Sequence, residues 1–166
     1  MPRRAVIGVM GAGESASATD LTLAERLGEL IAREGWVLLT GGRDAGVMAA
    51  ASRGAKRVPG SLTVGILSTE AGGVSDGVDV AVFTGMGNAR NAINVLSSQV
   101  VIACGAGGPG TASEIALALK SGKPVVLVSP TPFAESFFRT LGGRIFVVGC
   151  AEEAIALIKA QALMRP

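Results

Sequence analysis

The segment from residue 100 to residue 120 limits the possible folds more than any other stretch of the chain. It begins with the short apolar run Val100-Val-Ile-Ala-Cys104, continues through a glycine-rich stretch at 105–110, and ends in an Ala- and Leu-rich stretch at 111–120. A short run that is apolar at every position and rich in β-branched residues indicates a strand buried on both faces, as in a parallel sheet. The Ala- and Leu-rich stretch predicts a helix that begins just after the glycines.

The turn between this strand and this helix is suited to an anionic ligand. Four of its six residues are glycine, so backbone can approach a ligand closely, and the free N–H groups and positive dipole end of the helix face that ligand. Thr111 is the predicted N-cap, with Glu114 in the capping-box position. A tight turn without a ligand also uses glycine, so the rest of the chain has to decide between the two interpretations.

The same order of strand, loop and helix recurs along the chain. Strands are predicted over residues 5–10, 36–40, 62–67, 80–83, 100–104, 124–128 and 144–148. Helices are predicted over residues 19–33, 45–53, 111–120 and 151–162, from the loop at 84–90 to Ser98, and over a short stretch through Phe138. This alternation predicts one α/β domain over residues 1–166, with a Rossmann-like, doubly wound parallel sheet of about seven strands and helices on both faces.

Glycine-rich loops follow four of the predicted strands, and the carboxyl ends of parallel strands lie at one edge of a sheet. The candidate ligand-binding residues in these loops are Gly11, Gly13, Ser15, Gly41, Gly42, Arg43, Gly46, Met48, Asn88, Gly107, Gly108, Gly110 and Thr111. Some have alternative roles that stay open: Met48 as a core residue, Asn88 as a helix N-cap, and Arg43 in an ion pair with Asp44. Together the loops predict a pocket for a small phosphorylated ligand.

Two charged residues are candidates for a more specific role in this pocket. Arg90 stands at the start of a predicted helix, where the dipole disfavours a cation, and this placement favours anion binding over a purely structural role. Glu114 is either only a capping carboxylate or also a functional one, and the two roles are compatible.

Composition excludes several classes of function. The net charge is +2, with no Tyr and one Trp, so no nucleic-acid partner is expected. The chain has no His and two cysteines without a CxxC pair, so neither a metal site nor a His-based triad is expected. Both cysteines follow apolar runs and are expected to be buried, reduced thiols. No apolar run is long enough to span a membrane and no signal-peptide pattern is present, so no membrane partner and a cytoplasmic location are expected.

The loops resemble those of the Lonely Guy (LOG) and molybdenum-cofactor-carrier-like proteins of the SLOG superfamily, formerly described as possible lysine decarboxylases. The stretch Gly41-Gly-Arg-Asp-Ala-Gly-Val-Met48 resembles the family's GGGxxGLM loop, Gly107-Gly-Pro-Gly-Thr-Ala-Ser-Glu114 resembles its GGxGTxxE signature, and Arg90 matches the family arginine. The resemblance covers nearly the whole chain. It implies a nucleotide or phosphoribosyl-type ligand whose phosphate is held by the GGxGT backbone, and a homo-oligomer, which we expect to be a dimer or a tetramer.

The resemblance leaves two functions open. In the phosphoribohydrolase branch, residues at the positions of Arg90 and Glu114 are catalytic and act on the N-glycosidic bond of a nucleoside 5′-monophosphate, as in cytokinin activation. This chain differs from that branch: Ser113 replaces the first Glu of PGGxGTxEE, Asn91 replaces the Lys after the arginine, and Arg43 replaces the third glycine of GGG. It is more similar to the molybdenum-cofactor-carrier branch, which implies binding of a phosphate-bearing pterin, with molybdenum cofactor as the carried ligand and turnover left open.

Other interpretations find less support in the sequence. An NAD-dependent dehydrogenase is disfavoured because the loop Gly11-Ala-Gly13 lacks a third glycine and the second predicted strand ends in Leu39-Thr40, without an acidic residue. No lysine stands in a position that suggests a pyridoxal Schiff base, so lysine decarboxylation is not expected. A nucleotide-sensing regulatory domain is a third hypothesis, but no sequence feature indicates a partner protein.

Overall fold

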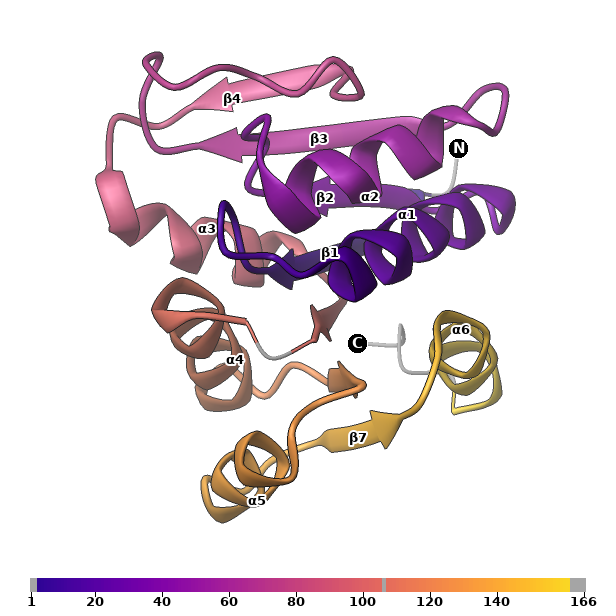
Figure 1. The fold of residues 1–166 in the computed structure, drawn as a ribbon, viewed down its shortest axis with the longest axis vertical. Coiled ribbons are helices and arrows are strands. Elements are labelled where there is room, and N and C mark those ends of the chain that lie inside the picture. Colours follow the sequence, from indigo (N-terminus) through magenta and orange to yellow (C-terminus); the bar gives the residue numbers. More distant parts are fainter. Residues whose placement is uncertain (1–2, 106, 162–166) are drawn as a thin grey trace.

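The centre of the protein is a seven-stranded sheet, seen in a computed structural model that describes residues 3–105 and 107–161. The strands are β1 (Val6–Gly11), β2 (Val37–Thr40), β3 (Leu62–Leu67), β4 (Val80–Phe83), β5 (Val100–Cys104), β6 (Val125–Val128) and β7 (Ile145–Val148). The helices are α1 (Ala18–Arg33), α2 (Gly46–Lys56), the 3-10 turn η1 (Gly87–Ala89), α3 (Arg90–Ser97), α4 (Pro109–Lys120), α5 (Pro132–Thr140) and α6 (Ala151–Ala160). All strand pairs are parallel, in the order β4-β3-β2-β1-β5-β6-β7 (Figure 1), which confirms the predicted fold class.

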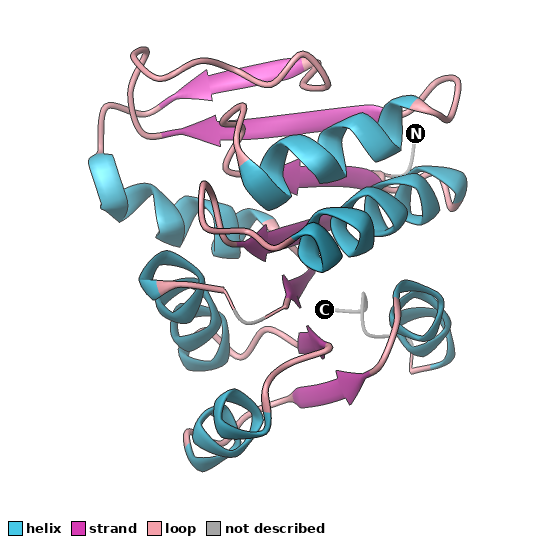
Figure 2. Cartoon of the chain, in the orientation of Figure 1, coloured by secondary structure: helices cyan, strands magenta, loops and turns pink. Residues whose placement is uncertain are grey.

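Helices cover both faces of the sheet (Figure 2). Helices α1, α2 and α6 pack on one face, and α3, α4 and α5 pack on the other. Strand β5 shows why the central strands are apolar at every position: Ile102 and Cys104 pack towards the first set of helices, whereas Val101 and Ala103 pack towards the second. Each face of a central strand therefore contributes to a separate core.

The strand boundaries lie within one residue of those predicted, but the helix boundaries differ more. Helix α4 begins at Pro109 rather than Thr111, because the fixed φ of proline suits the first helical position. Helix α2 continues past residue 53 to Lys56, since Gly54 and Ala55 are buried in the packed layer. Helix α6 ends at Ala160, and the predicted end at residue 162 lies outside the described residues.

Helices α1 and α2 approach each other very closely. A Cβ atom on Gly28 of α1 would clash with the carbonyl oxygen of Ala51, and a Cβ atom on Gly54 of α2 would clash with the carbonyl oxygen of Glu25. Each helix thus presents a glycine to the backbone of the other. This contact places the beginning of α2 beside the loop that follows β1.

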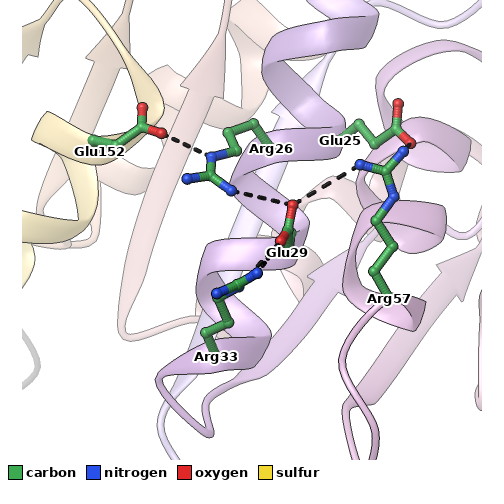
Figure 3. Close-up of polar contacts among 6 residues, drawn as sticks. All are labelled: Glu25, Arg26, Glu29, Arg33, Arg57 and Glu152. Atoms are coloured by element: carbon green, nitrogen blue, oxygen red, sulfur yellow. Dashed lines mark hydrogen bonds and ion pairs between the residues drawn. The ribbon is translucent and has the colours of Figure 1, made fainter.

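An ion-pair network on the outer side of α1 joins this helix to α2 and α6 (Figure 3). Its members are Glu25, Arg26, Glu29, Arg33, Arg57 and Glu152. At its centre is Glu29, whose carboxylate lies 2.6 Å from Arg33 Nη2 and 3.2 Å from Arg26 Nη1. Hydrogen bonds from Arg33, which has the largest effect, and from Arg26 lower the pKa of Glu29 below its usual value, although burial acts in the opposite direction. Arg26 also reaches Glu152 of α6 at 2.7 Å.

The two cysteines differ in their environments. Cys104 is fully buried at the end of β5, and burial raises the pKa of its thiol to about 12. Cys150, which was expected to be buried as well, is partly exposed because it is the N-cap of α6 at the surface. Both are free thiols.

The direction in which the sheet grows reverses between β1 and β5. From β1 the sheet continues through β2 and β3 to β4, and from β5 it continues through β6 to β7. In open α/β sheets, ligands bind outside the carboxyl ends of the strands at such a reversal. Among the helices of residues 3–105 and 107–161, none has both the length and the apolar character that crossing a bilayer requires.

Candidate ligand-binding site

A cavity of about 250 Å³ lies at this reversal point, at the carboxyl ends of the strands. Loops after β1, β2, β4 and β5 all contribute to its wall. The sequence-predicted residues that line it are Gly11, Gly13, Ser15, Gly41, Arg43, Met48, Asn88, Arg90, Gly108, Gly110, Thr111 and Glu114. The order of the parallel strands thus brings together predicted residues up to 103 positions apart, from Gly11 to Glu114.

The other three predicted residues do not line this cavity. Gly42 has a φ of +75° and packs against Gly65, whose Cα would lie 2.8 Å from an added Cβ. Gly46 has a φ of +50° and packs against the backbone of Gly13. Gly107 borders a separate, apolar cavity beside α5. Gly42 and Gly46 therefore shape the loops rather than the cavity surface.

Some cavity residues were missed by sequence reasoning. Val9 and Met10 belong to β1, and an apolar run gives no sign of which members face a ligand. Glu14 also lines the cavity. Its position directly after Gly11-Ala-Gly13 was an available signal, because a residue in that loop has to lie at the same edge of the sheet.

The first turn of α4 forms one side of the cavity. Its N-cap is Gly108 and not Thr111 as predicted, because Pro109 and Gly110 already adopt helical geometry. Thr111 is then the third helical residue, and it is buried, with 4% of its surface exposed. Pro109 has no N–H, and the N–H of Ala112 donates to the Gly108 carbonyl oxygen at 2.9 Å. The amides of Gly110 and Thr111 remain as first-turn donors that the helix itself does not use.

Arg90 joins the cavity to the ends of two strands. It is the first residue of α3, and its Nη1 donates to the carbonyl oxygens of Gly41 at 2.9 Å and Ile66 at 2.5 Å. Burial lowers the pKa of the Arg90 guanidinium, and the negative charge of Glu114 partly offsets this effect. The pKa of a free guanidinium is so high that Arg90 stays charged. Asn88 is not the N-cap of α3, because it lies within the preceding turn η1 and Ala89 is the cap.

Glu114 is a buried carboxylate in the cavity wall. Since Gly108 is the N-cap of α4, Glu114 lies beyond the capping-box position, and only 8% of its surface is exposed. Its Oε1 accepts a hydrogen bond of 2.8 Å from Nδ2 of Asn94. Burial raises the pKa of Glu114 above its usual value, whereas the bond from Asn94 and the charge of Arg90 act in the opposite direction.

An ion pair between Arg43 and Glu14 lies at the cavity rim. Arg43 Nη2 donates to Glu14 Oε1, so the alternative of an ion pair with the neighbouring Asp44 is wrong. A backbone hydrogen bond and the Arg43 guanidinium lower the pKa of Glu14, which is therefore ionised at neutral pH. The cavity wall thus contains two cations, Arg43 and Arg90, and two carboxyl groups, Glu14 and Glu114.

The described residues do not gather into a metal centre: within residues 3–105 and 107–161, no three His, Cys, Asp or Glu side chains lie close enough to share an ion. The polar groups of the cavity are instead amides, guanidinium groups, hydroxyls and carboxylates. This set matches a ligand that combines an anion with hydrogen-bond donors.

The fold and this cavity define a Rossmann-like protein with an anion-compatible site at the strand reversal. Residues 4–155 match the LDcluster4 SLOG cluster4 family, and the chain belongs to that family. Its fold is similar to that of the molybdenum cofactor binding protein from the phototrophic bacterium Rippkaea orientalis, with 52% identity, a TM-score of 0.93 and coverage of 98% of this chain and 99% of that one.

Two further relatives extend this likeness. The molybdenum cofactor carrier protein of Chlamydomonas reinhardtii shares 47% identity at a TM-score of 0.90, over 96% of this chain and 99% of that one. A protein of Archaeoglobus fulgidus is 46% identical over 149 residues, which cover 90% of this chain and 91% of the relative. These matches extend over nearly all of the sheet and the cavity loops.

Proposed function

We propose that this protein binds molybdenum cofactor, a phosphate-bearing pterin, in the cavity at the ends of β1 and β5. The similarity to a molybdenum cofactor binding protein and to a molybdenum cofactor carrier protein, at 52% and 47% identity, supports this ligand. The proposal includes a homo-oligomeric, cytoplasmic protein, either a dimer or a tetramer, without a nucleic-acid partner. Light scattering on the purified protein measures the number of subunits.

The phosphate of the ligand has a suitable place at the first turn of α4. The amides of Gly110 and Thr111 are available there, and the positive end of the helix dipole favours an anion. Arg43 and Arg90 line the same cavity and supply two positive charges. A phosphate monoester carries close to two negative charges at neutral pH, so two guanidinium groups match its charge.

The observation that favours binding without hydrolysis is the structural use of Ser113. This residue stands where the resembling phosphoribohydrolases have their first signature glutamate. Its Oγ accepts a hydrogen bond of 2.7 Å from Nδ2 of Asn91 and donates one of 2.7 Å to the Gly110 carbonyl oxygen. Ser113 therefore stabilises the first turn of α4. Hydrolysis at a sugar commonly uses two carboxylates, and the Ser113 hydroxyl does not supply the second one.

Anaerobic calorimetry with molybdenum cofactor tests the proposal. We expect saturable binding in the micromolar range or tighter, and much weaker binding of inorganic phosphate, because phosphate alone lacks the pterin contacts. The absence of a binding heat at about millimolar cofactor would contradict the proposal. Incubation with adenosine or isopentenyladenosine monophosphate tests the alternative: release of free base that disappears in Glu114→Ala would establish a phosphoribohydrolase.

The ion pair at the cavity rim predicts that removing one charged residue makes ligand binding tighter. Because Glu14 competes with the ligand phosphate for Arg43, Glu14→Gln should bind molybdenum cofactor about three- to ten-fold more tightly. The gain should shrink as salt is raised, because the pair is exposed and its charges are screened. Asp44→Asn is the matched control, since it removes a neighbouring carboxylate outside the cavity lining. Equal affinities of wild type and Glu14→Gln in calorimetry at low salt would show that Glu14 does not compete.

A further inference from the structure

We infer that Asn94 is a positioning residue that holds the Glu114 carboxylate in place to accept hydrogen bonds from N–H or O–H groups of the bound ligand. The inference rests on the proposed function, because it concerns the part of the same ligand that is not phosphate. Neither residue forms part of the phosphate contact at Gly110 and Thr111.

The burial of Asn94 is difficult to explain by stability. No surface of Asn94 is exposed, and its Nδ2 donates to Glu114 Oε1 at 2.8 Å. Its Oδ1 is a buried polar atom that has no partner within the described part of the chain. The flanking residues of the two helices, Val95 and Ile115, belong to an apolar core. A buried amide with an unsatisfied oxygen costs stability, and an apolar pair of similar size would not carry this cost.

Glu114 offers its other oxygen to the cavity. Oε1 is occupied by Asn94, whereas Oε2 has no donor within residues 3–105 and 107–161. Glu114 itself lines the cavity, as do Arg90 and the first turn of α4. An ionised carboxylate accepts hydrogen bonds only, so Oε2 suits an amino, ring N–H or hydroxyl group and not the phosphate oxygens.

Asn94 also opposes protonation of Glu114. Three effects act on the pKa of this carboxyl group: burial raises it, while the Asn94 hydrogen bond and the Arg90 charge, both from α3, lower it. The remaining charged groups of the cavity, Arg43 and Glu14, pair with each other at the rim. Removal of the Asn94 donor leaves burial opposed only by Arg90, and the Glu114 carboxyl group should then take up a proton at higher pH.

A second side-chain contact joins α3 to α4 beside the first. Asn91, one helical turn before Asn94, donates to Ser113, and Ser113 in turn donates to Gly110. Residues three apart on a helix face the same direction. Asn91 therefore sets the first turn of α4, and Asn94 sets Glu114, from the same face of one helix.

The experiment compares wild type, Asn94→Leu, Asn94→Asp and Glu114→Gln. Titration of 13C-labelled glutamate carboxyl groups by NMR, with the Glu114 signal identified by its absence in Glu114→Gln, reports protonation without any ligand. We expect the Glu114 titration to move to higher pH in Asn94→Leu. It should move in the same direction in Asn94→Asp, because two adjacent carboxyl groups resist double ionisation.

Calorimetry with molybdenum cofactor supplies the second readout. At neutral pH, Asn94→Leu should bind about ten-fold more weakly than wild type. Its affinity should recover towards wild type as the pH is raised and Glu114 ionises again. A purely structural role of Asn94 would not be repaired by raising the pH. Glu114→Gln shows how the affinity depends on pH through the ligand phosphate alone. Thermal denaturation confirms that each variant is folded.

The outcomes separate this inference from the proposed function. If wild type does not bind molybdenum cofactor, the proposed function fails, and a shifted NMR titration would still show that Asn94 controls Glu114 protonation. If wild type binds but the Asn94 variants keep both the wild-type titration of Glu114 and the wild-type affinity, the inference is overturned. Weaker binding that raising the pH does not restore, together with a wild-type titration of Glu114, would also overturn it.

Discussion

Replacing Gly28 with alanine is expected to lower the free energy of unfolding by about 3 kcal/mol, which corresponds to a fall in melting temperature of about 6 to 12 °C for a chain of this size. The added Cβ would clash with the Ala51 carbonyl oxygen of α2. A carbonyl oxygen in a helix cannot move aside as a side chain can, so α1 and α2 would have to separate. That movement would loosen contacts along the whole helix pair.

The reciprocal contact provides a second test of the same packing. Gly54→Ala should destabilise to a similar extent, because its Cβ would clash with the Glu25 carbonyl oxygen of α1. Gly110→Ala is the matched control: Gly110 is also a helical glycine, but an added Cβ would have no neighbour within 4 Å. In that variant, thermal denaturation should show unchanged stability or a gain of up to about 1 kcal/mol from the better helix propensity. If Gly28→Ala melts at the wild-type temperature, the close packing of α1 against α2 is contradicted.

Removal of the Arg90 side chain should have the largest effect on ligand binding. We expect Arg90→Ala to bind molybdenum cofactor about 100-fold more weakly, because it loses a partly buried cation from the wall of the cavity. It should also lose about 2 kcal/mol of stability, since the carbonyl oxygens of Gly41 and Ile66 lose their common donor. Calorimetry measures the first effect, and thermal denaturation measures the second.

Two comparison variants show how much of the affinity lost in Arg90→Ala is due to charge, to donor geometry and to reduced stability. Arg90→Lys keeps the positive charge without the planar fork of donors, and should recover only part of the affinity. Gly28 lies outside the cavity lining, so Gly28→Ala, studied below its melting temperature, shows how much affinity is lost through destabilisation alone. If Arg90→Ala retains the wild-type affinity, Arg90 serves only to connect the ends of β2 and β3.

The strands and their common edge were predictable because the signals for them are local. The uninterrupted apolar run of β5 indicated burial on both faces, and that run does contribute alternate side chains to two cores. Glycine-rich loops after parallel strands have to lie at one edge, so most residues named from those loops line a single cavity. The exceptions, such as Gly42 and Gly46, carry the same sequence signal but pack against neighbouring backbone.

The errors occurred where a side chain had more than one possible partner. Thr111 and Glu114 have the spacing of a capping box, but Pro109 starts the helix earlier and moves Glu114 into the buried wall. Arg43 stands next to Asp44 in the chain, yet it pairs with Glu14, 29 residues away. Asn94 gave no signal at all, because a single Asn inside an amphipathic helix resembles any other surface residue until α4 is packed against it.

Composition, apolar periodicity and the positions of glycine were sufficient for the parallel sheet and for the edge at which the cavity lies. These properties depend on backbone hydrogen bonding and on conformational preferences of neighbouring residues. The partners of Arg43, Arg90 and Glu114 follow only from three packing contacts. Helix α3 packs on α4 and against the ends of β2 and β3, and the β1 loop packs beside the β2 loop. Those contacts join residues 20 to 49 positions apart. Which contacts form depends on the burial of each group and on the other donors nearby, and a short stretch of sequence does not specify either.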